Sequence, residues 1–166
     1  MYVTADRAVG ATGVDAVVRE LRDRAEVVDA LYRFGLGQDI RDRELFASSF
    51  AVDAELDFRP VATKFGLSFP LMTGRESIVD TILGTLASID TTHVVTNPRV
   101  ELAGDTARLT AIVEAQHLPS EDHSRHLLLK NRYAVDLVRD GDRWVMRRVH
   151  IDKVWHTGEP AVLFGS

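Results

Sequence analysis

A carboxylate and an imidazole are the two side chains in this sequence that could together take a proton from carbon. Asp39 closes a run with helical spacing, and His93 opens a long strand-like segment. Asp39 follows Tyr32 by two helical turns, so both lie on one helix face with Val28 and Gly35, a face that should point at the core. An unpaired carboxylate is costly there, and we expect His93 to be the partner of Asp39.

This pairing has a defined acid–base chemistry. An Asp that accepts a hydrogen bond from one ring nitrogen of His fixes the tautomer and raises the basicity of the ring. The other nitrogen, here of His93, can then abstract a proton beside a carbonyl group, a step worth roughly 10²–10⁴-fold in rate. Tyr32 and a second histidine, His117, could donate to a carbonyl or to a leaving hydroxyl group. Isomerisation, loss of water or ring closure would follow.

Side chains along a strand point alternately to its two faces, so the strand-like segments place further candidate residues on the side that Asp39 and His93 would share. His117 ends an apolar row that starts at Leu109, and Asn131 is a polar residue within an otherwise apolar row. We therefore expect the side chain of Asn131 to contact a substrate or to make a hydrogen bond on the strand face.

Three further residues are candidates for substrate contacts. The alternation of odd and even positions does not decide which faces of segments 126–139 and 142–156 point inward. His150 lies on one of these faces and is therefore kept as a candidate. Phe58 lies on the apolar face of a short strand, and Phe69 lies in an apolar loop that could cover a pocket. Packing or a subunit contact is the structural alternative for both aromatic rings.

Other kinds of site are disfavoured by the residue pattern. Asp39, His93 and His117 could form a two-His, one-carboxylate metal site, but they contain no closely spaced pair such as HxH, and we predict no metal. The chain has no cysteine, which excludes thiolate chemistry and disulfides. Neither a glycine-rich phosphate loop nor a serine nucleophile motif is present.

The first half of the sequence predicts helices with one short strand among them. Apolar residues at helical spacing over 14–32 predict a long first helix, which Gly35 and Gly37 weaken near its end. Asp42 is a candidate N-cap of a short second helix. The pattern of 53–58 is typical of a short strand.

The remainder predicts an irregular loop, a helix and a sheet. An apolar loop spans 60–72, and a third helix follows over about 73–87. Four strand-like segments come next, at 92–102, 105–118, 126–139 and 142–156, and tight-turn residues join the first pair and the last pair as hairpins. A four-stranded antiparallel meander that curves around the first helix gives an α+β cone with a pocket inside.

Bulk composition is that of one ordinary globular domain. The chain has 166 residues, of which 45% are hydrophobic, and a net charge of −5 without a basic stripe, so no nucleic-acid partner is expected. No apolar run is long enough to span a bilayer, and no membrane partner is expected. We expect a flexible arm at 1–13, one domain at 14–160, a tail at 161–166, and a cytoplasmic location.

An ordered set of motifs resembles the SnoaL-like proteins of the NTF2-like superfamily, whose fold is a cystatin-like α+β cone. The resemblance covers about 14–160 and is closest to the branch of scytalone dehydratase, bile acid 7α-dehydratase and hexachlorocyclohexane dehydrochlorinase. The motifs that carry it are Leu31-Tyr32, Asp39-Ile-Arg-Asp42, Leu45, Phe46, Phe50, Asp53-Ala54, Thr92-His93, Thr96-Asn97, Val100-Glu-Leu, Gly104-Asp105-Thr-Ala107, Ala115-Gln-His117, Asn131-Arg-Tyr133 and Gly141-Asp-Arg-Trp144.

The resemblance implies roles for particular residues. Asp39 and His93 would form the catalytic dyad, His117 would match a second catalytic His, and Asn131 a hydrogen-bonding Asn. Tyr32 lies near a position where relatives carry a tyrosine that polarises the substrate carbonyl, whereas a second such tyrosine has no counterpart. Relatives need no cofactor or metal and are commonly trimers, which implies a homo-oligomer, either a trimer or a dimer.

These expectations combine into one functional prediction and three alternatives. We predict a cofactor-independent lyase of the dehydratase type that acts on a hydrophobic, cyclic, hydroxy-ketone-like substrate in secondary metabolism. A polyketide cyclase or a ketosteroid-type isomerase could use the same dyad. A non-catalytic small-molecule-binding module of the same fold is another alternative, and so is an enzyme whose base is Asp39 itself.

Overall fold

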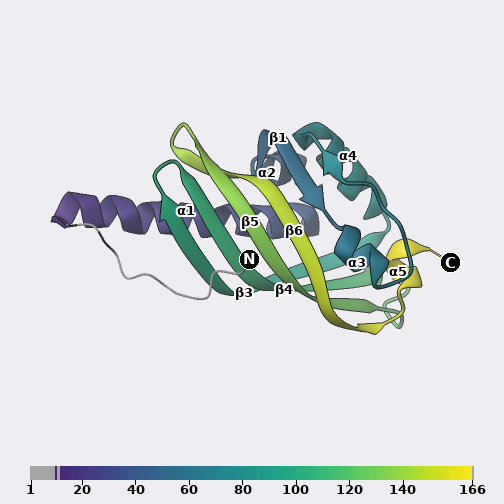
Figure 1. Cartoon of the computed structure of the whole chain (residues 1–166). Helices are drawn as coiled ribbons and strands as arrows, with labels where there is room; N and C mark the ends of the chain where they lie inside the picture. Colours follow the sequence, from purple (N-terminus) through teal and green to yellow (C-terminus); the bar gives the residue numbers. More distant parts are fainter. Residues whose placement is uncertain (1–9, 11, 166) are drawn as a thin grey trace.

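Most of the helices lie in the first half of the chain, and the four long strands of the sheet lie in the second half (Figure 1). The computed structural model describes Gly10 and residues 12–165, so most of the expected arm at 1–13 lies outside the described residues. The elements are α1 (Val14–Asp39), α2 (Arg43–Ala47), β1 (Phe50–Asp57), α3 (Arg59–Thr63), β2 (Met72–Thr73), α4 (Arg75–Thr85), β3 (Ile89–Ala103), β4 (Thr106–Pro119), β5 (Leu127–Asp140), β6 (Arg143–Gly158) and α5 (Ala161–Phe164).

The sheet contains the predicted meander and two further strands. Its order is β2-β1-β6-β5-β4-β3, and β3 to β6 pair antiparallel with their neighbours in sequence. β1 pairs in parallel with β6, where Leu56 lies opposite Val149. The long helix α1 lies across one face of the curved sheet (Figure 1), which confirms the predicted α+β cone.

The core lies between α1 and the inner face of the sheet. Leu31 and Phe34 of α1 are buried there, and Phe34 packs edge-on against Phe46, Phe50 and Tyr133 at ring-centroid distances of 5.5, 5.7 and 5.9 Å. Such edge-to-face contacts are the preferred geometry of aromatic pairs. The aromatic cluster therefore holds the C-terminal part of α1 against both α2 and the sheet.

Two glycines allow this close packing rather than ending the helix. Helix α1 continues through Gly35 and Gly37, contrary to our expectation that they weaken its end. A Cβ atom on Gly37 would lie 2.5 Å from the backbone nitrogen of Phe46, and one on Gly35 would lie 3.0 Å from Cβ of His93. Both glycines are thus needed for the approach of α2 and of β3 to α1.

The predicted cap of the second helix is confirmed. The side chain of Asp42 accepts a hydrogen bond from the backbone N–H of Leu45 at 2.9 Å, which satisfies one of the amides that a helix start leaves unpaired. The chain turns sharply just before this cap, because Arg41 has a positive φ of 58°. Helix α2 can therefore fold back against the end of α1.

Two bulges in β6 decide which of its faces points inward. The register of β5 and β6 shifts once between Met146 and Arg148 and again between Lys153 and Trp155. Each bulge adds one residue and reverses the alternation of the strand. Met146 therefore faces the core before the first bulge, and Ile151 faces it afterwards.

Segments expected to be irregular form part of the packed structure. The loop at 60–72 overlaps the short helix α3 and reaches the first residue of β2. The expected tail at 161–166 contains α5, whose Phe164 packs against Phe65 and Phe69 at 5.2 and 5.9 Å. Short apolar helices of this kind leave almost no periodic signal in a sequence.

Candidate active site

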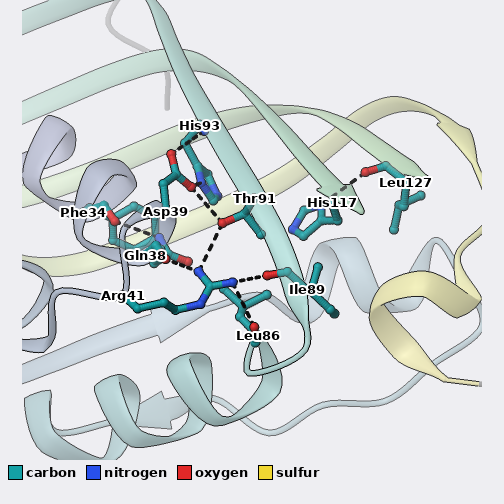
Figure 2. Close-up of polar contacts among 10 residues, drawn as sticks. All are labelled: Phe34, Gln38, Asp39, Arg41, Leu86, Ile89, Thr91, His93, His117 and Leu127. Carbon is teal, nitrogen blue, oxygen red and sulfur yellow. Dashed lines mark hydrogen bonds and ion pairs between the residues drawn. The ribbon is translucent and has the colours of Figure 1, made fainter. Parts of the chain in front are cut away.

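Asp39 and His93 are in direct contact, as the sequence predicts (Figure 2). Asp39 Oδ1 lies 2.6 Å from Nδ1 of His93, and Asp39 Oδ2 accepts the backbone N–H of His93 at 2.7 Å. Their side chains are 15% and 5% exposed, respectively. A carboxylate that accepts from Nδ1 leaves Nε2 of His93 as the nitrogen available to a ligand.

A second pair of residues holds this contact in place. The hydroxyl of Thr91 donates to Asp39 Oδ1 at 2.9 Å, and the guanidinium of Arg41 reaches Thr91 Oγ1 at 3.4 Å. Arg41 also donates to the backbone oxygens of Leu86, at 2.9 Å, and Ile89. Figure 2 shows how Arg41 thereby joins the end of α1 to the end of α4 and the start of β3.

His93 lines a mostly apolar cavity of about 360 Å³ at the inner face of the sheet. Two larger hollows of about 630 and 530 Å³ lie on the outer face, where charged side chains such as Arg108 and Asp136 pair with each other at 3.1 Å. Of these three hollows, only the inner cavity has His93 in its wall. Its other polar lining residues include Gln38, His117, Asn131 and Tyr133.

His117 is a neutral hydrogen-bond acceptor in this cavity. Its ring lies 6.2 Å from that of His93, and its Nδ1 lies 3.2 Å from the backbone oxygen of Leu127. Burial, followed by the neighbouring His93, lowers the pKa of His117 to about 4. Because a carbonyl oxygen only accepts, Nδ1 carries the proton and Nε2 has a lone pair, so the expected role of proton donor does not fit neutral pH.

Asn131 and Tyr133 complete the polar lining on β5. Asn131 is 1% exposed, and within the described residues its buried Oδ1 has no hydrogen-bond partner. Tyr133 is also buried, and burial together with the charge of Asp39 raises the pKa of its hydroxyl group. The hydroxyl therefore stays protonated and is available as a donor.

Two predicted site residues lie elsewhere. Tyr32 is 49% exposed and does not line the cavity, because the buried face of α1 runs through Leu31 and Phe34. Asp39, at the end of α1, reaches Thr91 and His93 of β3. His150 lies on the outer face of β6 and is exposed, with Nδ1 3.2 Å from Oδ2 of Asp57, because the first bulge turns it outward.

The two predicted aromatic residues do line the cavity. Phe58 and Phe69 are both part of its wall, and each packs against Phe164 of α5, at 6.3 and 5.9 Å. Sequence reasoning missed Tyr133 and Phe164 as lining residues. The signal for Tyr133 was present, because it follows Asn131 by two residues on the same strand face.

Two features are absent from the described residues. Nowhere in Gly10 and 12–165 do three or more His, Asp or Glu side chains form a group that could hold a metal ion. Within the same part of the chain, no helix combines the length and the apolar character that crossing a membrane requires.

Comparison with known proteins identifies relatives by sequence. The family described as SnoaL-like domain matches residues 19–150. The chain is also 32% identical over 153 residues to terrestric acid biosynthesis cluster protein E of Penicillium crustosum, an alignment that covers 88% of this chain and 92% of the relative. The family match includes Asp39 and the whole of β3.

Solved structures agree with the fold. A scytalone dehydratase-like protein of Novosphingobium aromaticivorans DSM 12444 superposes with a TM-score of 0.72 at 18% identity, covering 84% of this chain and 89% of that one. The hexachlorocyclohexane dehydrochlorinase LinA-type3 of Novosphingobium barchaimii LL02 has a TM-score of 0.70 at 20% identity, covering 87% and 95%. At these identities the likeness concerns the fold.

Proposed function

This chain belongs to the SnoaL-like family, and on that premise we propose that it is a small-molecule lyase of the dehydratase type. The observation that carries the proposal is the 2.6 Å contact between Asp39 and Nδ1 of His93 at the wall of an apolar cavity. A carboxylate in this position orients the imidazole and stabilises its charged form, which is the arrangement that a general base requires.

The proposed reaction is an elimination beside a carbonyl group. Nε2 of His93 takes the proton from the carbon next to the carbonyl, and Asp39 stabilises the imidazolium that forms. The hydroxyl of Tyr133 donates to the carbonyl oxygen as negative charge develops on it. The imidazolium then returns its proton to the departing hydroxyl group, which leaves as water, and the base is restored without a cofactor.

The polar lining indicates what the substrate must offer. Nε2 of His117 and the unpaired Oδ1 of Asn131 both accept hydrogen bonds, so a ligand needs hydroxyl groups that donate to them. The remaining wall is mainly apolar and aromatic. We therefore propose an uncharged, cyclic hydroxy-ketone, and the name of the Penicillium crustosum relative supports a place in secondary metabolism.

Turnover of a panel of cyclic β-hydroxy ketones tests this proposal. His93→Gln should lower kcat/KM by roughly 10²–10⁴-fold, the value of a positioned base, whereas Asp39→Asn should retain part of the activity. The reverse order would identify Asp39 as the base. Tyr133→Phe should lower kcat, and the matched variant Tyr32→Phe should leave it unchanged.

Product analysis separates the alternative functions. Loss of water from the substrate supports the lyase, whereas a product of unchanged mass supports an isomerase. Saturable binding without turnover, unaffected by His93→Ala, would overturn the catalytic proposal in favour of a binding module. Two earlier expectations stay proposals: a homo-oligomer, testable by light scattering, and a cytoplasmic location, testable by cell fractionation.

A further inference from the structure

A buried amine lies beside the aromatic wall of the cavity but is not used in the proposed reaction. Lys153, on the inner face of β6, is only 7% exposed. Its Nζ lies 3.6 Å from the centroid of the Phe65 ring and 3.1 Å from Nδ1 of His156. Phe65 packs in turn against Phe164, which lines the cavity.

Lys153 differs from the other two lysines of the chain in having no acidic partner. Lys64 pairs with Asp152 at 2.5 Å, and Lys130 pairs with Glu114. Within the described part of the chain, no Asp or Glu forms an ion pair with Lys153. A buried ammonium without a counter-charge is unfavourable, which favours the neutral amine at this position.

One neighbouring charge acts in the same direction. Lys64 donates to the backbone oxygen of Lys153 at 2.5 Å, which brings a second positive charge close to the amine. Burial, and then this neighbouring charge, lower the pKa of Lys153, whereas the face of the Phe65 ring and the acceptor nitrogen of His156 stabilise the ammonium form. Desolvation and a nearby cation are two conditions that make a lysine more nucleophilic.

His156 is a base within reach of this amine. Its Nδ1 accepts a hydrogen bond from Lys153 at 3.1 Å, and partial burial, followed by the charge of Lys153, lowers the pKa of the ring, which favours its neutral form. The ring is held edge-on against Phe65 at 4.8 Å, and His156 itself is exposed, so the pair is open to solvent on that side. A nucleophile, a base and a group that orients the base are thus adjacent.

We propose that Lys153 is a carbonyl-reactive amine that forms an imine with small aldehydes or ketones. The lone pair of Nζ attacks the carbonyl carbon, and the new C–N bond forms as the C=O π pair moves to oxygen. His156 carries the first N–H proton to that oxygen, which gives a carbinolamine. It then carries the second N–H proton to the new hydroxyl group, which leaves as water as the C–O bond breaks and the C=N bond forms. The net change is amine plus carbonyl giving imine plus water, and it does not involve His93.

Trapping with a hydride reagent tests the proposal on the full chain. The protein is incubated with benzaldehyde and sodium cyanoborohydride at pH 7, and peptide mass spectrometry measures the rate of benzylation at each lysine. We expect Lys153 to be labelled several-fold faster than Lys64 or Lys130. His156→Phe keeps an aromatic ring but removes the base, and should slow labelling at Lys153 alone.

Two controls make the outcome decisive. Lys153→Met should abolish the fast label, whereas Lys130→Met should leave it in place, with circular dichroism verifying that both variants are folded. Equal labelling of the three lysines, or no adduct on Lys153 between pH 6 and 9 in the folded wild-type protein, would overturn the proposal. The kcat of the elimination tests the role of His93, and the labelling rate tests the role of Lys153. Failure of one proposal can therefore be distinguished from failure of the other.

Discussion

Asp39 accepts three hydrogen bonds, and each comes from a different donor group. The hydroxyl of Thr91, the backbone amide of His93 and the ring of His93 share its two oxygens. Hydrogen bonds to a carboxylate stabilise its charge and also divide that charge among the donors. The position of the Asp39 carboxylate against His93 therefore depends on Thr91.

Replacing Thr91 by valine should lower the rate of the reaction. Without the hydroxyl, Asp39 loses one of the three donors that fix its position against Nδ1 of His93. The loss of one hydrogen bond to a charged group, about 1.5–3 kcal/mol, should lower kcat/KM at pH 7 roughly ten- to hundredfold. Thr91→Ser should restore the activity, and a kcat/KM of Thr91→Val equal to that of the wild type would refute the coupling.

His117 should make stability depend on pH in a defined window. Its pKa in the folded protein is about 4, below the ordinary value of 6.5, so the unfolded chain binds more protons between these values. Stability should fall as the pH drops from about 6.5 to 4, by up to about 1.4 kcal/mol per pH unit. Urea unfolding at several pH values measures this slope, and His117→Asn should reduce it.

At the scale of elements, the contact between α1 and β3 sets the position of the base. Gly35 leaves room for the backbone of β3, and a methyl group there would meet Cβ of His93 at 3.0 Å. A contact this short requires the strand to move by a few tenths of an ångström. Catalytic geometry tolerates such displacements poorly.

Gly35→Ala should therefore reduce activity more than stability. We expect kcat/KM to fall roughly tenfold or more, while urea unfolding shows a change of about 1 kcal/mol or less, because alanine also favours the helix. Gly37→Ala is the matched control, since its methyl group would meet the backbone of Phe46 at 2.5 Å and should mainly cost stability. Full activity in folded Gly35→Ala would contradict this assignment.

Residue spacing predicted the helices and strands well, but it predicted less well which side chains point into the cavity. The meander, the long helix and the Asp39–His93 contact follow from periodicity, from turn residues and from the cost of an unpaired carboxylate. His150 could not be placed, because the bulge after Met146 reverses the alternation without any glycine or proline to indicate it. Tyr32 lies beside the buried face of α1 that includes Leu31 and Phe34, a difference of one position that helical spacing does not resolve.

At the scale of the whole molecule, a polar cluster in the N-terminal half of α1 connects the helix to the sheet. Asp23 accepts two hydrogen bonds from Arg139, both at 2.9 Å, and one from Nε1 of Trp144 at 3.1 Å. The bond from Arg139, the largest contribution, lowers the pKa of Asp23, with Trp144 adding to the effect. The charged form of Asp23 is thus favoured by folding.

Asp23 should contribute to stability against acid. Because its pKa is lower in the folded protein, its stabilisation is complete above its ordinary pKa of 3.8 and is lost as the pH falls through the lower folded value. Asp23→Asn should lower the free energy of unfolding at pH 7 by about 1–3 kcal/mol and flatten the acid limb below pH 4. Thermal unfolding at pH 7 and pH 3 measures both effects, and an equal loss at the two pH values would contradict the assignment.

The position of β1 within the sheet has a consequence for how the chain acquires its structure during synthesis. β1 pairs in parallel with β6, which follows the other five strands of this sheet in the chain, so its inner side chains Ala54 and Leu56 have no neighbouring long strand until β6 is made. Contacts between such distant segments form slowly, and they leave apolar surface uncovered in the meantime. The nascent chain can hold α1, α2 and the first hairpin before release, but the wall of the cavity that Leu56 and Ile151 share can close only after translation of β6 is complete.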